Sequence, residues 1–410
     1  MSAERGSDQR GWTIADGSGT IGKESCETTA SMRILILHSR YLSGWASGEN
    51  SVVRDEERLL TEAGHDVVSW TPSPGAQFSP ERLGLKAMWS SAAVKHVGRL
   101  IERHRPQIVH CHNLYPMLSP AVLRAASKRD SKVVVTLHNY RMFCLPATCL
   151  RGGEICELCL GRVPWRGVVY RCYRRSLPGS TALGAALTLH RAIGSFDQVS
   201  LFLPVSHFVL DKHVQAGFAQ DRMHMKPNFC WPQPRRSGAG EYFLYVGRLA
   251  PEKDLGTLLK AWRSIRAPLI LAGDGPDRKA LEELAPEGVE FRGTVSPEEV
   301  TTLLKGARAL LFPTRCNEGG PRSVIEAYAA AVPVIATSLG ALPEMVEDGI
   351  SGLLVPPGGT DSWVKAVATL GDTTTAARLG EGAFNRWARL HSPERGLVEL
   401  EGAYRAALVA

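Results

Sequence analysis

The feature that most constrains the fold is a succession of short, unbroken apolar runs, each followed by a helical stretch. The run "RILILHS" at 33–39 shows no alternation of apolar and polar residues, which is typical of a parallel strand buried on both faces. The stretch "SVVRDEERLLTEAG" follows it and closes at Gly64, a common residue after a helix C-terminus. Runs of the same kind read "HDVVSW", "PQIVHCH", "KVVVTLHN" and "VSLFLPVS". The pattern predicts a doubly wound α/β domain whose binding edge lies at the carboxyl ends of its strands.

A second set of apolar runs begins after a break in this rhythm. The stretch "FCWPQPRRSGAGE" at 229–241 is rich in Pro, Ser, Gly and charged residues, as linkers are. Strand and helix then alternate again through "YFLYVGRL", "APLILAGDGP", "VEFRGTV", "RALLFPT", "VPVIATS" and "SGLLVPPG". The sequence therefore predicts two Rossmann-like domains that face each other across a cleft, where ligands commonly bind.

The domain boundaries follow from these breaks. We expect a leader at 1–31 that is disordered or an over-extended start with Met32 as the working one, a first domain at 32–228 with an insertion at 143–178, a linker at 229–240, a second domain at 241–385, and a C-terminal helix at 386–410 that packs back on the first domain. The leader lacks the basic start and apolar core of a secretion signal. No apolar run approaches the roughly 20 residues of a membrane-spanning helix. With 44% hydrophobic and 22% charged residues, the chain is typical of soluble globular proteins, and we expect it in the cytoplasm.

The stretch "CNEGGPRSVIEAY" contains two glutamates that are candidates for catalysis or ligand binding. Glu318 lies in a strand-to-helix turn and Glu326 about one turn into the helix. Gly319 and Gly320 let the backbone approach a ligand closely, and the helix N-terminus favours phosphate. Both glutamates can face one bound molecule, although they are not expected to flank a scissile bond as a glycosidase pair does. The alternative is an ordinary helix start with an exposed glutamate.

Cationic side chains lie on the loop after the first strand of the second domain. Arg248 and Lys253, in "YVGRLAPEKD", are suited to hold a pyrophosphate, Arg through a forked donor and Lys as a point charge. They are otherwise a pair of solvated surface charges. The turn "LAGDGP" contains Gly275 but lacks the full dinucleotide-binding pattern. In "FRGTVSPEEV", the backbone near Val295 is placed where it could meet a base.

This set of motifs, in this order, resembles the retaining glycosyltransferases of family 4, two-domain enzymes of the GT-B fold. The resemblance spans nearly the whole chain after Met32 and is most specific in the second domain. It implies that the second domain binds a nucleotide-sugar donor, with UDP, GDP or another nucleoside diphosphate. It further implies these donor-binding residues: Gly247, Arg248, Lys253, Gly275, Val295, Gly319, Gly320, Ser323 and Glu326. Many relatives have "EGFG" where this chain has "EGGP", a departure that bears on the donor sugar.

The resemblance assigns the acceptor and the reaction centre to the first domain. His138 would be the active-site histidine and Glu318 would lie beside the reacting face, so these two are the candidate catalytic residues. Gly44 and Gly48, in the loop "SGWASGEN", and His112 would line the reaction centre. Without the resemblance, histidines at strand ends are more often structural.

The implied activity is transfer of a sugar from a nucleotide donor to an acceptor hydroxyl of a polysaccharide, glycolipid or secondary metabolite. No DxD-like metal site is evident, so cationic side chains and helix N-termini would stabilise the departing diphosphate in place of a divalent ion. We expect no cofactor to be required for catalysis. The alternatives are a related GT-B epimerase or phosphorylase, or a non-catalytic protein that binds nucleotide sugars or nucleic acid.

Five of the nine cysteines lie in the insertion, and four of them, Cys144, Cys156, Cys159 and Cys172, have spacings permissive for a structural zinc. Reduced thiols near the acceptor site are the alternative. The insertion also carries arginines at 162, 166, 171, 174, 175 and, just beyond it, 191, interleaved with aromatic residues. Such a patch suits peripheral contact with anionic lipid or a phosphorylated acceptor, or is a solvated loop. No nucleic-acid-binding motif accompanies it, so we expect no nucleic acid partner.

Overall fold

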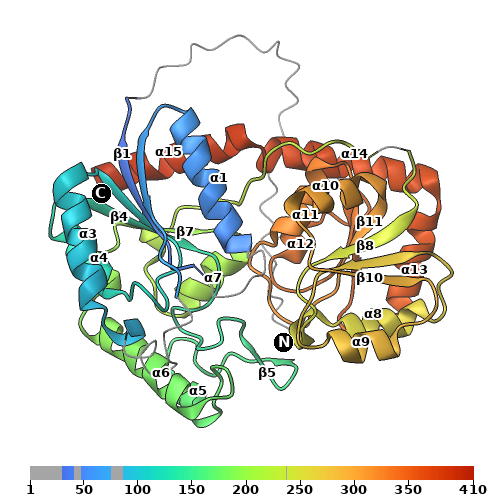
Figure 1. The fold of residues 1–410 in the computed structure, drawn as a ribbon, viewed down its shortest axis with the longest axis horizontal. Coiled ribbons are helices and arrows are strands. Elements are labelled where there is room, and N and C mark those ends of the chain that lie inside the picture. Colours follow the sequence, from blue (N-terminus) through green and yellow to red (C-terminus); the bar gives the residue numbers. More distant parts are fainter. Residues whose placement is uncertain (1–29, 41–47, 75–85, 237) are drawn as a thin grey trace, which may run out of the picture. The chain divides into compact units, whose positions relative to one another are not determined.

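The computed structural model describes residues 30–40, 48–74, 86–236 and 238–410. Among these residues, parallel strands form a first sheet in the order β2-β1-β3-β4-β7 (Figure 1). Every residue of β3 and β7 is buried, which explains why their sequences lack a polar alternation. The strands are β1 (Arg33–Leu37), β2 (Asp66–Trp70), β3 (Ile108–Cys111), β4 (Lys132–Leu137) and β7 (Leu201–Pro204).

Helices cover both faces of this sheet, because successive side chains of a strand point to opposite sides. Leu35 and Leu37 of β1 pack in an apolar cluster with α3, α4 and α6, whereas Ile34 and Ile36 pack with α1 and the C-terminal α15. The helices are α1 (Gly48–Glu62), α3 (Ser91–His104), α4 (Ala121–Ser127), α6 (Leu177–Ala192), α7 (His207–Gln215) and α15 (Pro393–Val409).

A second parallel sheet has the order β10-β9-β8-β11-β12-β13. Leu244 of β8 packs with α10, α11 and α14 on one face, and its neighbour Phe243 packs with α8 and α13 on the other. The strands are β8 (Tyr242–Val246), β9 (Leu269–Ala272), β10 (Val289–Gly293), β11 (Ala307–Phe312), β12 (Val334–Thr337) and β13 (Gly352–Val355). The helices are α8 (Leu255–Trp262), α9 (Arg278–Leu284), α10 (Pro297–Gly306), α11 (Arg322–Ala329), α12 (Leu342–Met345), α13 (Thr360–Gly371) and α14 (Thr373–Leu390).

The last two helices serve different sheets. α14 packs against α11 and α13 of the second sheet's layers, whereas α15 contacts β4, β7 and α1 (Figure 1). Ser392 caps the start of α15 by accepting a hydrogen bond from the backbone N–H of Arg395. The phenol of Tyr404, in α15, lies 2.9 Å from Nδ1 of His110 in β3. The C-terminal helix therefore contributes to the core of the first sheet.

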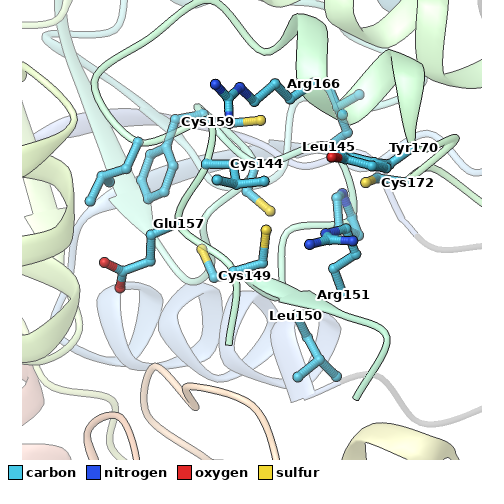
Figure 2. A pocket seen from close by; sticks show the side chains of 16 residues that line it. Cys144, Leu145, Cys149, Leu150, Arg151, Glu157, Cys159, Arg166, Tyr170 and Cys172 are labelled. Carbon is cyan, nitrogen blue, oxygen red and sulfur yellow. The ribbon is translucent and has the colours of Figure 1, made fainter. Parts of the chain in front are cut away.

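The insertion between β4 and α6 has little regular structure. It contains the two-residue strands β5 (Leu150–Arg151) and β6 (Glu154–Ile155) and the short helix α5 (Trp165–Val169). Its five cysteines line one pocket, and Figure 2 shows the sulfur atoms of Cys144, Cys159 and Cys172 around it.

The described elements confirm the predicted fold class of two doubly wound, Rossmann-like domains, each with a parallel sheet between helices. In the described residues, no helix or strand lies between the 3₁₀ turn at Gln220–Arg222 and β8. None of the helices that the structure describes is both long and apolar enough to cross a membrane.

Candidate functional site

Three histidines follow neighbouring strands of the first sheet. His38 comes directly after β1, His112 after β3 and His138 after β4. Because the strands are parallel, their carboxyl ends meet at one edge, and this edge holds the predicted His112 and His138. The rings of His112 and His138 stack with centroids 5.2 Å apart, and their Nδ1 and Nε2 atoms are 2.9 Å apart.

Loops at the carboxyl edge of the second sheet carry the predicted donor-binding residues. The loop after β8 and the loop after β9 touch, because the backbone N–H of Leu249 donates to the carbonyl of Asp274 at 2.9 Å. A Cβ on Gly275 would lie 2.1 Å from the carbonyl oxygen of Leu249, so only glycine permits this approach. The structure thus brings Gly247, Arg248 and Gly275 to one edge, and Val295 follows β10, the strand beside β9 in that sheet.

The turn that carries Glu318 lies against the first sheet's edge. A Cβ on Gly319 would be 2.9 Å from the carbonyl oxygen of His138, and one on Gly320 would be 3.2 Å from Val205. Asn228 fixes the turn, since its side-chain N–H donates to the carbonyl of Gly320 at 3.1 Å. The two glycines therefore allow the loop between β11 and α11 to reach the predicted active-site histidine.

Glu318 forms an ion pair with Lys253 at this place. The Nζ of Lys253 lies 2.6 Å from the carboxylate of Glu318, which also accepts a hydrogen bond from the Thr314 hydroxyl at 3.2 Å. Burial lowers the pKa of Lys253, but the charge and hydrogen bond of Glu318, together with Tyr245 and Cys316, more than offset it, so this pKa is raised. Lys253 is therefore a cation at neutral pH, held at the end of the 3₁₀ turn at Pro251–Lys253.

Glu326 belongs to a separate ion pair. Its carboxylate lies 2.6 Å from Nε of Arg322, and a terminal nitrogen of the same guanidinium lies 2.5 Å from Asp55 in α1. Burial raises the pKa of Glu326, and the charge of Arg322 opposes that rise. The two glutamates that stand eight positions apart in the sequence thus have different cationic partners. Gly48, at the start of α1, also packs near Arg322.

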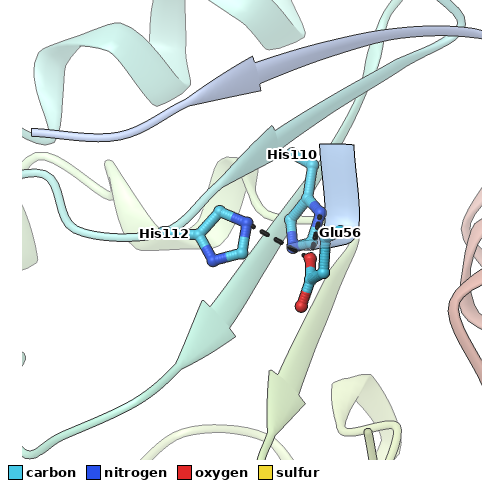
Figure 3. A group of neighbouring side chains, drawn as sticks. All are labelled: Glu56, His110 and His112. Atoms are coloured by element: carbon cyan, nitrogen blue, oxygen red, sulfur yellow. Dashed lines mark ion pairs between the residues drawn. The ribbon is translucent and has the colours of Figure 1, made fainter. Parts of the chain in front are cut away.

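Glu56 lies beside His110 and His112, as Figure 3 shows. Glu56 of α1 is fully buried, with one carboxylate oxygen 3.4 Å from Nε2 of His112 and its other oxygen on the Nζ of Lys226. The connected groups run from Lys226 through Glu56 and His112 to His138. The contact between Glu56 and His112 is an ion-pair distance and not a hydrogen bond, since Oε2 of Glu56 and Nε2 of His112 both lack a hydrogen-bond partner in the described structure. Glu56 therefore lies beside the His112 ring as a buried carboxylate paired with Lys226.

The electrostatics of this group favour neutral imidazoles. Burial lowers the pKa of His112 and of His138 well below the usual value, and neighbouring positive charge, including that of Lys226, adds to the effect. In the tautomer in which His138 holds its hydrogen at Nε2, it donates the 2.9 Å hydrogen bond to Nδ1 of His112. The Nδ1 atom of a neutral His138 then carries a lone pair that is able to accept a hydroxyl hydrogen bond.

One set of possible metal ligands lies in the same place. In the described part of the chain, the only three His, Cys, Asp or Glu ligand atoms within 4.8 Å of one another belong to Glu56, His110 and His112 (Figure 3). The ammonium of Lys226 already contacts Glu56, and both His110 nitrogens face hydroxyl groups, those of Tyr404 at 2.9 Å and Thr136 at 2.7 Å. The arrangement is that of an internal ion pair rather than a cation site.

The remaining predicted residues are placed as follows. Arg248 is more than half exposed and lies 3.8 Å from Glu252, while Val295 packs against the core of the second sheet. Ser323 is in the first turn of α11. Gly44 lies outside the described residues. The cysteines Cys144, Cys156, Cys159 and Cys172 line a pocket in the insertion, where hydrogen bonds from Cys149 lower the pKa of the Cys144 thiol to about 7.

Sequence reasoning missed four charged residues of this region: Asp55, Glu56, Lys226 and Arg322. Only Glu56 left a signal, because it interrupts the apolar stripe of α1 between Val52, Val53, Leu59 and Leu60, all of which are buried. A glutamate at the centre of such a stripe must be paired when buried. The other three are recognisable only by their contacts across the fold.

Comparisons with known proteins match both halves of the chain. Residues 46–230 match the family model described as Glycosyltransferase Family 4, and residues 240–372 match the model described as Glycosyl transferases group 1. The matched ranges contain His138 and the Glu318–Glu326 segment, respectively.

Individual relatives give the same picture. An α-D-kanosaminyltransferase of Streptomyces kanamyceticus is 29% identical over 40% of this chain and 45% of its own length. A GDP-mannose-dependent α-mannosyltransferase of Corynebacterium glutamicum is 23% identical over 79% of this chain and 76% of its own. Among solved structures, that of the Anabaena protein HepE with UDP and glucose covers 90% of this chain and 99% of its own, with a TM-score of 0.62 and 17% identity.

Proposed function

We propose that this chain, which belongs to the GT-B glycosyltransferases of family 4, transfers a sugar from a nucleoside-diphosphate donor to an acceptor hydroxyl with retention of configuration. The observation that carries the proposal is the meeting of three groups. The Lys253–Glu318 ion pair lies in the loop region whose Gly319 packs against the backbone of His138. A donor-binding cation, a carboxylate and a neutral imidazole are thereby available to one substrate.

The donor diphosphate is assigned to the edge of the second sheet. Lys253 and Arg248 supply positive charge, and the N-terminus of α11 at Arg322 and Ser323 offers backbone N–H groups. Gly247, Gly275, Gly319 and Gly320 allow close approach of the donor. Glu326 is assigned to the ribose, which it can bind while Arg322 neutralises part of its charge.

The reaction follows from where charge develops. The acceptor oxygen bonds to the anomeric carbon, the bond from that carbon to the β-phosphate oxygen breaks, and its electron pair stays with the diphosphate. The acceptor proton passes to the departing phosphate on the same face of the sugar. Lys253 and Arg248 stabilise the new negative charge. Glu318 is engaged by Lys253 and Thr314, so we assign it to orienting the donor sugar and not to covalent attack.

His138 is assigned to a hydroxyl of the donor sugar. The Nδ1 lone pair of its neutral ring accepts the hydroxyl hydrogen in the tautomer whose Nε2–H donates to Nδ1 of His112. The similar proteins include a GDP-mannose-dependent mannosyltransferase and a protein solved with UDP, so both nucleotides are tested. The acceptor is a hydroxyl of a polysaccharide, glycolipid or secondary metabolite.

Calorimetry and donor hydrolysis test this function. The purified chain is titrated with UDP, GDP and ADP and then incubated with UDP- and GDP-sugars without acceptor. We expect one nucleotide to bind and the matching sugar to be released slowly, and we expect His138→Ala to reduce release while nucleotide affinity is kept. Binding of a nucleotide without sugar release from any donor, also after addition of acceptor extracts, would identify a binding module instead.

A second test asks whether transfer requires a divalent metal ion. Because Arg248, Lys253 and a helix N-terminus provide the positive charge, we expect transfer to continue in EDTA. Loss of activity that magnesium or manganese restores would contradict this assignment.

We also propose that the surface around α5 meets an anionic bilayer. Around α5, large apolar side chains are exposed beside the arginines at 162, 166, 171, 174 and 175: Val163, Trp165, Val169, Tyr170 and Leu177. Trp with Arg on one short surface is suited to the interface of a negatively charged membrane. Sedimentation with phosphatidylglycerol vesicles should retain the chain, and Trp165→Ser should weaken retention more than Val398→Ser, a change at an exposed apolar residue of α15. Equal retention of both variants would place the contact elsewhere.

A further inference from the structure

The cysteines of the insertion converge although they are spread over almost thirty residues of sequence. Cys144, Cys149, Cys156, Cys159 and Cys172 line a single pocket, and all are free thiols (Figure 2). Cys144 and Cys149 are buried, whereas the other three are partly exposed. Free thiols of structural cores are commonly dispersed among aliphatic side chains, as Cys111 is in β3. Five that face one space require a specific explanation.

The pocket has the size of an ion. Its cavity volume is about 20 Å³, close to the roughly 10–15 Å³ that one water-sized sphere needs. A sugar or nucleotide is far too large for it. The predominantly apolar and sulfur-bearing walls offer thiolate ligands, which favour zinc and other soft cations over magnesium or calcium.

Donors and positive charges surround the sulfur atoms. The backbone N–H and the thiol of Cys149 face the sulfur of Cys144, and the backbone N–H of Gly167 faces that of Cys159. A Cβ on Gly167 would be 3.7 Å from the sulfur of Cys159 and 2.8 Å from Leu145, so glycine is required there. Such N–H groups orient thiolate ligands from outside the metal's own shell.

Arginines supply the charge that a cluster of thiolates needs. Arg151 contacts Cys156 and lies near Cys172, Arg166 lies near Cys159, and Arg141 lies near Cys144. A divalent ion with four thiolates carries a net charge of −2. The guanidinium groups around the pocket are therefore placed to compensate it.

The backbone of the insertion is held in unfavourable conformations. Half of the ten described non-glycine residues with positive φ lie here: Ala147, Cys149, Arg171, Arg174 and Arg175. Such conformations persist only where surrounding contacts enforce them. The regular structure available is two strands of two residues each and a five-residue helix. A cross-link at the cysteines would provide the missing constraint, as metals do in other segments with small cores.

We propose that the insertion binds one structural zinc ion through Cys144, Cys156, Cys159 and Cys172. The Cys-x2-Cys pair provides two ligands, and the flanking cysteines provide one from each side. Cys149 is the remaining thiol, placed as a hydrogen-bond donor to Cys144. On binding, the four thiols release their protons to solvent and four zinc–sulfur bonds form without any change of oxidation state.

The ion draws the sulfur atoms together. Among the described residues, no three of the five sulfur atoms lie within 4.8 Å of one another, whereas sulfur atoms in tetrahedral zinc sites are about 3.8 Å apart for zinc–sulfur bonds of about 2.3 Å. The segments that bear them are loops, which contract more easily than helices. Because this insertion starts five residues after His138, zinc binding would fix the chain that follows the candidate catalytic histidine.

Metal analysis of the full chain tests the proposal. After expression with added zinc and extensive dialysis, elemental mass spectrometry should find about one zinc per chain. Cys156→Ser, Cys159→Ser and Cys172→Ser should each lose most of the zinc, and Cys149→Ser and Cys230→Ser should keep it. Wild-type protein with less than a tenth of an equivalent of zinc, or equal zinc in all five variants, would overturn the proposal.

A measurement on the wild type remains informative if the variants do not fold. Alkylation of the native chain with iodoacetamide, read by peptide mass spectrometry, should spare the four ligand cysteines until a strong chelator is added. Cobalt added to the chelated chain should give the intense absorption of thiolate–cobalt charge transfer. An intact mass two daltons lower, which indicates a disulfide between Cys144 and Cys149, or alkylation unaffected by chelator would overturn the proposal. These readouts do not depend on the proposed transfer reaction.

Discussion

At the scale of single residues, the site contains several ion pairs, and each lies in a different part of it. Lys253 is paired with Glu318, Arg322 with Glu326 and Asp55, and Lys226 with Glu56. The first pair lies at the place assigned to the donor, the second joins α1 to α11, and the third lies beside the histidines. Neutralising one partner of each pair should therefore have distinct effects.

Lys253→Met should weaken binding of the preferred nucleoside diphosphate by about 10-fold to 100-fold, because a hydrogen bond to a charged group contributes roughly 1.5–3 kcal/mol. The matched control is Lys260→Met, which removes an exposed lysine at the end of α8. Calorimetric titration gives both affinities. Equal affinities in the two variants would show that Lys253 does not bind the diphosphate.

Glu56→Gln should destabilise the protein by about 3–5 kcal/mol, because Lys226 then keeps a buried charge without a partner. The double variant Glu56→Gln/Lys226→Met removes both charges and should recover much of that loss. Urea unfolding of the wild type, both single variants and the double variant measures the coupling. If the two single effects simply add, the pair does not act as a unit.

The same double variant separates stability from positioning. With the fold recovered but the carboxylate absent, His112 loses the buried carboxylate that lies 3.4 Å from its Nε2. We expect kcat to fall while nucleotide affinity stays at the wild-type value. An unchanged kcat in a folded double variant would limit Glu56 to a structural role.

At the scale of elements, the loop between β11 and α11 connects two regions. It joins the carboxyl edge of the second sheet, which we assign to the donor, to the edge of the first sheet that holds the histidines. Gly319→Ala places a Cβ 2.9 Å from the carbonyl oxygen of His138, so the loop or the strand end must shift. A displacement of this kind at a reacting centre can cost about 100-fold in rate. Gly371→Ala, at the end of α13 with no atom within 4 Å of the new Cβ, is the control. Initial rates of donor hydrolysis compare the two.

Elements were the level at which the sequence was most informative. Buried parallel strands such as β4 and β12 read as unbroken apolar runs because both of their faces are covered. Because the strands are parallel, their carboxyl ends meet at one edge, and the loops after them could be assigned to that edge. The contact between Gly319 and His138 could not be predicted, since it depends on how two sheets far apart in sequence meet.

At the scale of the whole molecule, charged partners were the least predictable part. Glu56, His112 and Lys226 are separated by more than fifty residues each, and no local pattern links them. Arg322 lies two residues after Gly320 in the sequence, yet its role emerges only from its contact with Asp55. Spacing identifies residues that share an element, whereas ion pairs across the fold require the packing of several elements.

Buried histidines in both halves predict how the whole molecule responds to acid. Burial lowers the pKa of His213, in α7, and of His391, after α14, to about 4. Their unfolded pKa is about 6.5, so the unfolded chain binds more protons between these values. The stabilisation is present above about pH 6.5 and is lost as pH falls toward 4, at up to about 1.4 kcal/mol per pH unit for each histidine.

Urea unfolding midpoints measured across this window should therefore fall with decreasing pH. Carboxylates titrate in the lower part of the window too, so the contribution of one histidine is isolated by comparison. His391→Gln removes the titrating ring while its amide can still donate to the carbonyl of Asn228, which His391 reaches at 2.8 Å. The variant should show a shallower decline than the wild type, and His104→Gln, at the end of α3, should not. Identical slopes for all three proteins would show that His391 is already protonated in the native state.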